Sequence, residues 1–138
     1  MISAQRTVSH PPDRVFEFLS DLRNHWRLEE HAFLELDEVG ERSGVIRLTG
    51  PFGVSRTVRT EVLEAQPVTR MAGRAELPGG TVGLVAWEIR PVGGGSHVTL
   101  SAEVASASLP DRTLLALGGR AWLRRLFDRV LANLETAL

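Results

Sequence analysis

Residues 93–111 read GGGSHVTLSAEVASASLPD, and this stretch contains a turn, a strand and the start of a helix in succession. The glycines at its beginning are typical of a tight turn. From residue 97 to 106, apolar and polar side chains alternate, which predicts a strand with one covered and one wet face. Ser108 and Asp111, on either side of Pro110, are typical of a helix start. The stretch therefore places the last strand of a sheet directly before a C-terminal helix.

Upstream of residue 93 the same alternation recurs between short breaks that contain glycine or proline. It predicts strands at residues 32–39, 44–50, 54–65, 69–77 and 80–91, in addition to 97–106. Because each break is short, neighbouring strands should pair antiparallel. Residues 2–9 form a further predicted strand, which we expect to pair with the last one.

Helical periodicity occurs near both ends of the chain. Residues 12–22 begin with a proline, which the first helical turn tolerates, and carry apolar residues at the spacing of one helix face. A second short helix or turn is expected at 24–28, and a long helix from about residue 109 to 137. The sequence thus predicts one α+β domain over residues 1–138. We expect a seven-stranded curved antiparallel sheet wrapped around the C-terminal helix, with two short helices after the first strand.

The residue types that the chain lacks exclude several kinds of chemistry. None of its 138 residues is cysteine, tyrosine or lysine, so all 16 basic side chains are arginine. This composition excludes disulfides, thiolate metal sites, a cysteine nucleophile and a lysine Schiff base. Arginine without lysine is typical of a GC-rich genome, and we expect a bacterial source.

Charge and hydropathy give no sign of a nucleic-acid or membrane partner. The formal net charge is −1, which provides no general attraction to nucleic acid or anionic lipid. No apolar run reaches the roughly 20 residues of a membrane span, and the first residues lack the apolar stretch of a signal peptide. We expect a cytoplasmic protein; whether it forms a homodimer is left open.

Three local patterns resemble one protein family. Residues 8–22 read VSHPPDRVFEFLSDL and are followed by Asn24 and Trp26; Pro67 precedes Arg70 and Met71; and residues 87–91 read WEIRP before a glycine-rich turn. These patterns resemble the polyketide cyclase/dehydrase and lipid-transport (SRPBCC) branch of the START-related helix-grip superfamily. The resemblance implies the helix-grip fold over the whole chain. It also implies a hydrophobic ligand, because members of the family bind, carry, cyclise or sense such molecules.

Small residues on the predicted inner face of the sheet suggest an internal cavity. Gly73, Ala75 and Gly83 should face the C-terminal helix, and a helix laid across a curved sheet does not touch all of it. The alternative is that small residues let the helix pack more closely. The predicted ligand-binding lining, for which plain core is the alternative at every position, is Trp26, Leu36, Leu48, Val58, Met71, Trp87, Leu100, Trp122 and Leu126.

Few polar side chains are candidates for a role in this cavity. His25 is a candidate for orienting a ligand, and Arg56, if its side chain points inward, for anchoring an anion or carbonyl. His25, Glu29, Glu30 and His31 match no strong zinc spacing, and a solvated polar face is the simpler interpretation. No glycine-rich turn precedes a helix in the manner of a dinucleotide site. We therefore predict no metal and no cofactor, and catalytic residues are not assigned.

Two classes of function fit these observations. The first is a non-enzymatic carrier or sensor of a small hydrophobic or aromatic, lipid- or polyketide-like molecule. The second is a polyketide cyclase, aromatase or dehydratase that uses the same cavity; a third reading is a module of a larger assembly. Two or more polar side chains at hydrogen-bond spacing in the cavity, at least one of them titratable, would favour the enzyme.

Gly118 and Gly119 interrupt the predicted C-terminal helix. They form either a hinge that opens the cavity or a simple break between two helices. If they form a hinge, replacing both with alanine should slow ligand exchange and raise stability by about 1–2 kcal/mol.

Overall fold

The computed structural model describes residues 1–28, 33–37, 40, 42–49 and 55–138, and for residues 33–37, 48 and 49 it describes the backbone alone. The elements in chain order are β1 (Ile2–Val8), α1 (Pro12–Leu19), α2 (Leu22–His25), the 3₁₀ turn η1 (Trp26–Leu28), β2 (Phe33–Asp37), β3 (Ser43–Thr49), β4 (Ser55–Gln66), β5 (Arg70–Leu77), β6 (Thr81–Val92), β7 (Gly95–Ser106), α3 (Leu109–Leu114), the π-helical turn η3 (Leu115–Gly119) and α4 (Arg120–Ala137).

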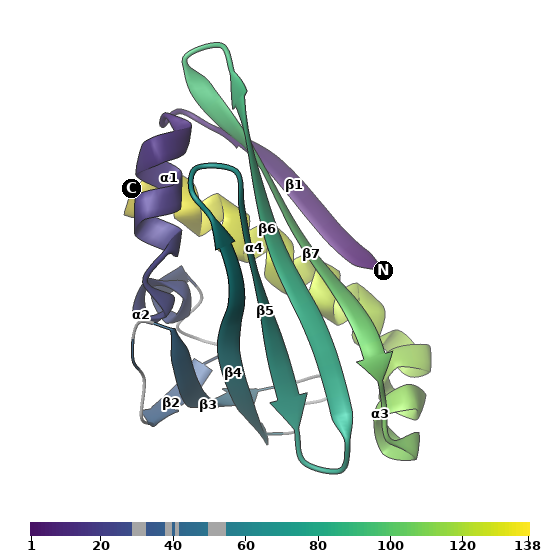
Figure 1. The fold of residues 1–138 in the computed structure, drawn as a ribbon. Coiled ribbons are helices and arrows are strands. Elements are labelled where there is room, and N and C mark those ends of the chain that lie inside the picture. The colour runs from purple at the N-terminus through teal and green to yellow at the C-terminus, as the bar shows by residue number, and fades with distance from the viewer. Residues whose placement is uncertain (29–32, 38–39, 41, 50–54) are drawn as a thin grey trace.

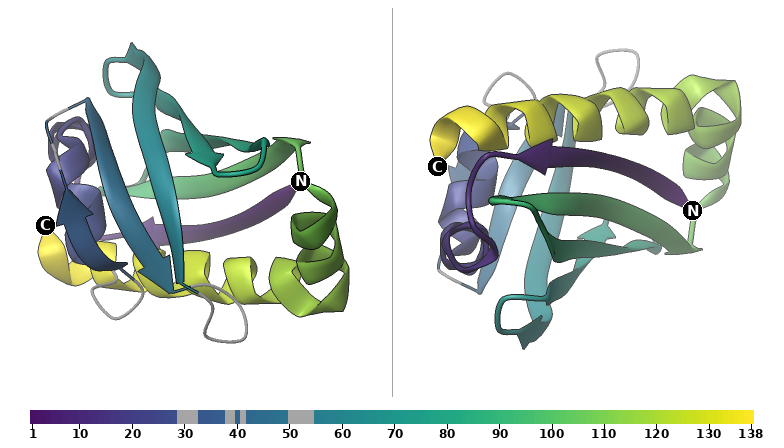
Figure 2. Two further views of the ribbon diagram at one scale, coloured as in Figure 1. Left: turned by 90° about the horizontal axis from the view of Figure 1, so that it is seen from below. Right: turned by 90° about the horizontal axis from the view of Figure 1, so that it is seen from above.

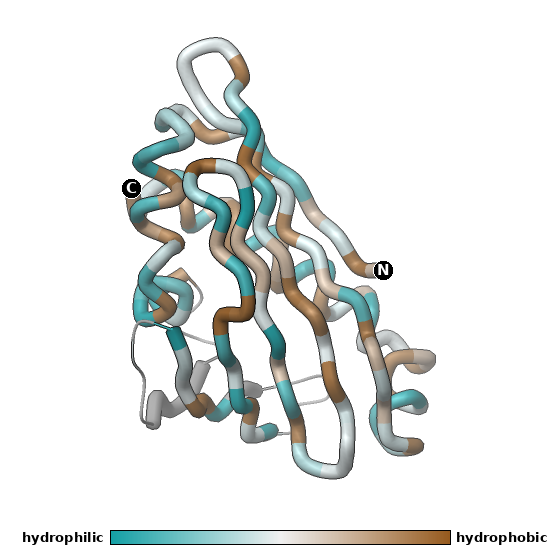
Figure 3. Tube along the Cα trace, viewed as in Figure 1, coloured by the Kyte–Doolittle hydropathy of each residue, from teal (hydrophilic) through white to brown (hydrophobic). Residues whose placement is uncertain are grey.

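The strands form one open antiparallel sheet in the order β1-β7-β6-β5-β4-β3-β2. The predicted α+β class, the antiparallel meander and the long C-terminal helix are confirmed. So is the pairing of the first strand with the last, because β1 pairs β7 from Ile2↔Ala102 to Val8↔Ser96. Apolar and polar residues interleave along the strands (Figure 3).

The helix predicted at residues 12–22 is divided in two. Helix α1 begins at Pro12 and buries Val15 and Leu19 on one face. Asp21 then adopts an extended conformation, and its side chain accepts a hydrogen bond from the backbone N–H of Arg23. Asp21 thereby acts as the N-cap of α2 and turns the chain between the two helices.

Helix α4 lies across the concave side of the curved sheet (Figures 1 and 2). Its backbone approaches the sheet mainly along the edge strand β1 and, to a smaller extent, β7. Helices α1 and α2 lie beside the C-terminal end of α4, whereas α3 lies at its other end (Figure 2). Among the helices of the described ranges, none has the length and apolar content needed to cross a bilayer.

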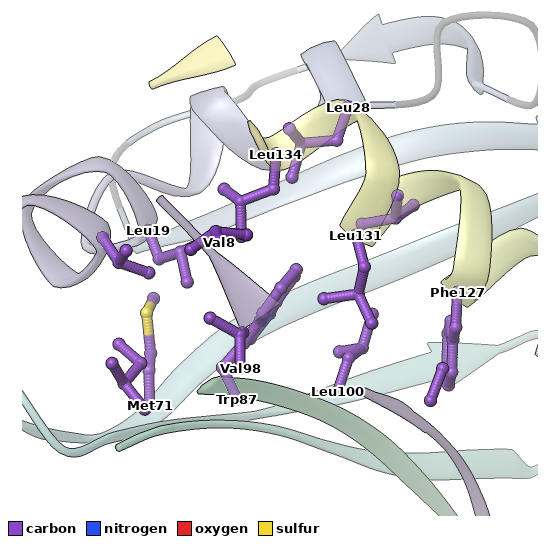
Figure 4. Packing of buried hydrophobic residues seen from close by; sticks show 14 of the residues in the cluster. Val8, Leu19, Leu28, Met71, Trp87, Val98, Leu100, Phe127, Leu131 and Leu134 are labelled. Atoms are coloured by element: carbon purple, nitrogen blue, oxygen red, sulfur yellow. The ribbon is translucent and has the colours of Figure 1, made fainter. Parts of the chain in front are cut away.

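The tightest packing is found around the C-terminal half of α4. Leu131 and Leu134 are 1% and 0% exposed, and they pack with Val8 of β1, Val98 of β7 and Leu19 of α1 in one cluster (Figure 4). A cluster this completely buried fixes the end of α4 to the sheet.

The break at Gly118 and Gly119 has a geometry that the sequence did not suggest. Gly118 has φ +119°, which places it in the region that only glycine adopts readily, and a Cβ at Gly119 would stand 2.7 Å from the carbonyl oxygen of Leu114. The expectation that alanine stabilises both positions was wrong, because Gly118 is not helical and Gly119, although helical, leaves no room for a Cβ. The hinge itself stays a prediction.

We predict that Gly118→Ala lowers the free energy of unfolding by about 1–2 kcal/mol, since alanine is strained at positive φ. Urea denaturation measures the change. Gly94→Ala is the matched control, because a Cβ there meets no atom within 4 Å, and it should change stability by less than about 0.5 kcal/mol. Equal effects of the two substitutions would contradict the assignment of strain to Gly118.

Candidate functional site

A cavity of about 320 Å³, partly open at the surface, lies between α4 and the inner faces of β4, β5, β6 and β7. Residues of α2, η1 and α3 also line it. Gly73, Ala75 and Gly83 belong to its wall, as the small inward residues predicted. Its volume is near the lower end of the range for small-molecule sites, and its wall is mostly apolar.

Most of the residues proposed from sequence meet at this cavity. Its lining includes Trp26, Val58, Met71, Trp87, Leu100, Trp122, Leu126, His25 and Arg56. The side chains of Leu36 and Leu48 lie outside the described part of the chain, as do Glu29, Glu30 and His31. The structure thus brings nine of the proposed side chains together, while their role in ligand binding stays a prediction.

His25 is held in one orientation by the end of the preceding helix. Its Nε2 lies 2.7 Å from the carbonyl oxygen of Leu19. A carbonyl oxygen only accepts, so Nε2 carries the hydrogen and donates it. The imidazole also makes edge contacts with two indoles, at 5.5 Å from the ring centroid of Trp87 and 6.2 Å from that of Trp26.

The surroundings of His25 keep its imidazole uncharged. Burial among apolar groups lowers the pKa of His25 below 6.5, and this effect outweighs the hydrogen bond to Leu19 and the more distant Asp21 carboxylate, which raise it. With Nε2 protonated and the ring neutral, Nδ1 has a lone pair and acts as an acceptor.

A second polar group lies in the cavity wall, at the end near α3. Both terminal nitrogens of Arg56 donate to the carboxylate of Asp111, one of them at 3.0 Å. The hydroxyl of Thr81 donates to the same carboxylate. Ser108 caps α3 by accepting from the backbone N–H of Asp111. The guanidinium predicted to anchor an anion is therefore already paired with a carboxylate of the protein.

This pairing moves both groups away from proton transfer near neutral pH. The hydrogen bonds from the Arg56 guanidinium are the largest cause that lowers the pKa of Asp111, to about 2. The same interaction raises the pKa of Arg56. A general acid or base is most effective when its pKa lies near the working pH, and neither member of this pair meets that condition.

Sequence analysis missed Asp111 and Thr81 as members of the site. Asp111 was assigned only to the start of a helix, and no local signal pairs it with Arg56, which lies 55 positions earlier in the chain. Thr81, at the start of β6, gave no signal, because its partner lies 30 residues further along the chain.

Comparison with known proteins places the chain in a family. The family described as polyketide cyclase / dehydrase and lipid transport matches residues 1–138. The chain belongs to this family. No curated protein sequence shows significant similarity to it.

Solved structures of the same fold are distant in sequence. The KanY protein has a TM-score of 0.76 at 18% identity, with 99% of this chain and 94% of that chain covered. TTHA0849 from Thermus thermophilus has a TM-score of 0.71 at 19% identity, covering 98% and 94%. DynU16, from the dynemicin biosynthetic locus, has a TM-score of 0.64 at 18% identity, and 98% of this chain matches 45% of that one. At these identities the likeness concerns the fold.

We predict that Asp111→Asn lowers the free energy of unfolding at pH 7 by about 2 kcal/mol, because it leaves the half-buried Arg56 without its counter-charge. The pKa of Asp111 is lowered from 3.8 to about 2 in the folded protein, so its contribution is present above pH 3.8 and is lost as pH falls toward 2. The difference in free energy of unfolding between wild type and variant should therefore become smaller as pH falls from 3.8 toward 2.

Urea denaturation of both proteins at pH 7, 5 and 2.5 measures this difference in free energy of unfolding. Glu88→Gln serves as the control, since it removes an exposed cross-strand ion pair with Arg70 and should cost less than about 0.5 kcal/mol. A gap that stays constant down to pH 2.5 would contradict the assigned pKa.

We also predict that the protein loses stability as pH falls below about 6.5. The unfolded chain then binds a proton at His25 that the folded protein, with its lowered pKa, does not bind. The slope from this group reaches at most about 1.4 kcal/mol per pH unit. His25→Gln should lack this component in urea titrations between pH 7.5 and 5.5, and identical slopes in both proteins would refute it.

Proposed function

We propose that this protein binds a small, mostly apolar molecule in the cavity between α4 and the sheet. The observation that carries the proposal is a cavity of about 320 Å³ that is partly open at the surface and has a mostly apolar wall. Apolar surface that is left uncovered in a concave site of this size is typical of a place where a small molecule binds. Family membership supports the same interpretation.

The wall suits binding better than reaction. The charges of Arg56 and Asp111 in this wall neutralise each other, and Thr81 and Ser108 form hydrogen bonds with Asp111. His25 is a further titratable group of the wall, which also includes Glu61, Arg74 and Glu103, and the Nε2 hydrogen of His25 is donated to the carbonyl of Leu19. A carrier or sensor needs an apolar surface with a few orienting polar groups, and this wall has that composition.

A cyclase or dehydrase is the second candidate, and one observation favours it. Arg56, Asp111 and Thr81 are polar side chains at hydrogen-bond spacing in the cavity wall, which is the arrangement that sequence analysis named as a sign of an enzyme. Their shifted pKa values oppose a role in proton transfer. A rate above background with a linear polyketide mimic would establish this candidate.

Binding can be tested with a neutral fluorescent probe, N-phenyl-1-naphthylamine. Trp26, Trp87 and Trp122 all line the cavity, so bound probe should accept excitation energy from them and emit with a saturable, one-to-one dependence on concentration. Native mass spectrometry of protein purified from its own host would then identify any retained ligand.

We predict that Ala75→Phe weakens probe binding at least about tenfold, because the ring occupies cavity volume. Ala75 lies on the same face of β5 as the buried Met71 and pairs with Gly83. Ala105→Phe makes the same change at an exposed position of β7 outside the cavity and should leave affinity unchanged. Thermal unfolding of both variants checks that they fold. No saturable binding to wild type, or equal affinity in the two variants, would overturn the proposal.

A further inference from the structure

We propose that His25 determines specificity in this cavity, by accepting a hydrogen bond at Nδ1 from a hydroxyl or N–H group of a neutral, mostly apolar ligand. This inference rests on the proposed function and adds to it the class of molecule that the cavity selects.

The first step is the fixed direction of the imidazole. Nε2 donates to the carbonyl oxygen of Leu19 at 2.7 Å, and Trp26 and Trp87 contact the ring at their edges. A ring held on three sides presents its second nitrogen in one direction. Such fixed polar groups give a binding site its selectivity.

The second step is that Nδ1 has no partner among the residues that the structure describes. It accepts no hydrogen bond from any residue in the described ranges. It is also absent from the set of described side-chain atoms that are fully buried without a partner, so Nδ1 keeps some accessible surface. His25 itself lines the cavity. An acceptor that is accessible and unsatisfied beside an apolar space gains a hydrogen bond when a donor arrives there.

The third step concerns which ligands the lone pair rejects. A carboxylate or other anionic oxygen would face the lone pair of Nδ1 and be repelled. An ether or hydrocarbon of the same shape would bury Nδ1 without a partner, at the cost of its desolvation. A hydroxyl or N–H group satisfies it, so the site distinguishes donors from isosteres without a donor.

The Arg56–Asp111 pair in the wall supports the assignment of the ligand's donor to His25. Arg56 and Asp111 are hydrogen-bonded to each other, and the hydroxyl of Thr81 donates a further hydrogen bond to the Asp111 carboxylate. That end of the cavity therefore needs no polar ligand atom. His25, from α2, and Asp111, from α3, belong to helices at opposite ends of α4 (Figure 2). The hydrogen-bond donor of the ligand should thus lie at the α2 end.

A cycle of two ligands and two proteins tests the proposal. Calorimetry measures the affinities of 4-tert-butylphenol and its methyl ether, 4-tert-butylanisole, for wild type and His25→Phe. We expect the substitution to weaken the phenol about five- to tenfold, which is the size of one buried hydrogen bond, and to change the ether less than about twofold. His25→Gln, whose amide can donate to Leu19 and whose carbonyl oxygen can accept from the ligand, should keep more of the preference for the phenol than His25→Phe does.

A measurement on the unsubstituted protein guards against misfolded variants. In ¹⁵N-labelled wild type, the phenol should shift the Nδ1 resonance of His25 in the direction of an accepted hydrogen bond, and the ether should not. Equal effects of the substitution on both ligands, or an unmoved Nδ1 resonance with bound phenol, would overturn the role of His25 and leave the binding function intact. Binding of the naphthylamine probe without the phenol would overturn it too. Failure of all three ligands to bind would instead reject the binding function.

Discussion

Helix α4 meets the curved sheet along one side, and the cavity depends on this contact. Its backbone comes close to the edge strand β1, while the inner faces of β4, β5 and β6 curve away from it. Apolar side chains fill the gap around Leu131 and Leu134, but not toward the beginning of the helix. A straight rod against a curved surface leaves a space that widens away from their line of contact, and side chains decide whether it is filled.

Small residues keep the space open where the paired central strands β5 and β6 face the helix. Ala75 pairs directly with Gly83, and Gly73 with Val85, so this part of the wall is thin. Gly73 has a second reason to be glycine, because a Cβ there would stand 2.7 Å from the carbonyl oxygen of Glu61 at an irregularity between β4 and β5. A β-bulge adds local twist, and the same position thus contributes both curvature and volume.

Local patterns were enough to predict the strands, and distant pairings were not. Alternation with a period of two located the strands to within about two residues, because each depends on its own side chains. It also placed Met71 and Trp87 on the inner face, where they pair across β5 and β6. The ion pair of Arg56 with Asp111 joins residues 55 positions apart, and no local pattern specifies it. The break at Asp21 and the conformation of Gly118 also depend on backbone angles that composition does not reveal.

The polar groups of the cavity differ in what they leave for a ligand. Arg56 and Asp111 are full charges, and a charged pair inside a protein is tolerated only when its hydrogen bonds are satisfied, so its members are occupied with each other. His25 is uncharged, and one of its two nitrogens satisfies the end of α1 while the other is not used by the described residues. The charged side chains of Arg56 and Asp111 are therefore paired with each other, whereas the uncharged imidazole keeps one nitrogen that the described residues do not use. In a wall without tyrosine or lysine, a neutral imidazole with one unused nitrogen offers a hydrogen-bond acceptor that carries no charge.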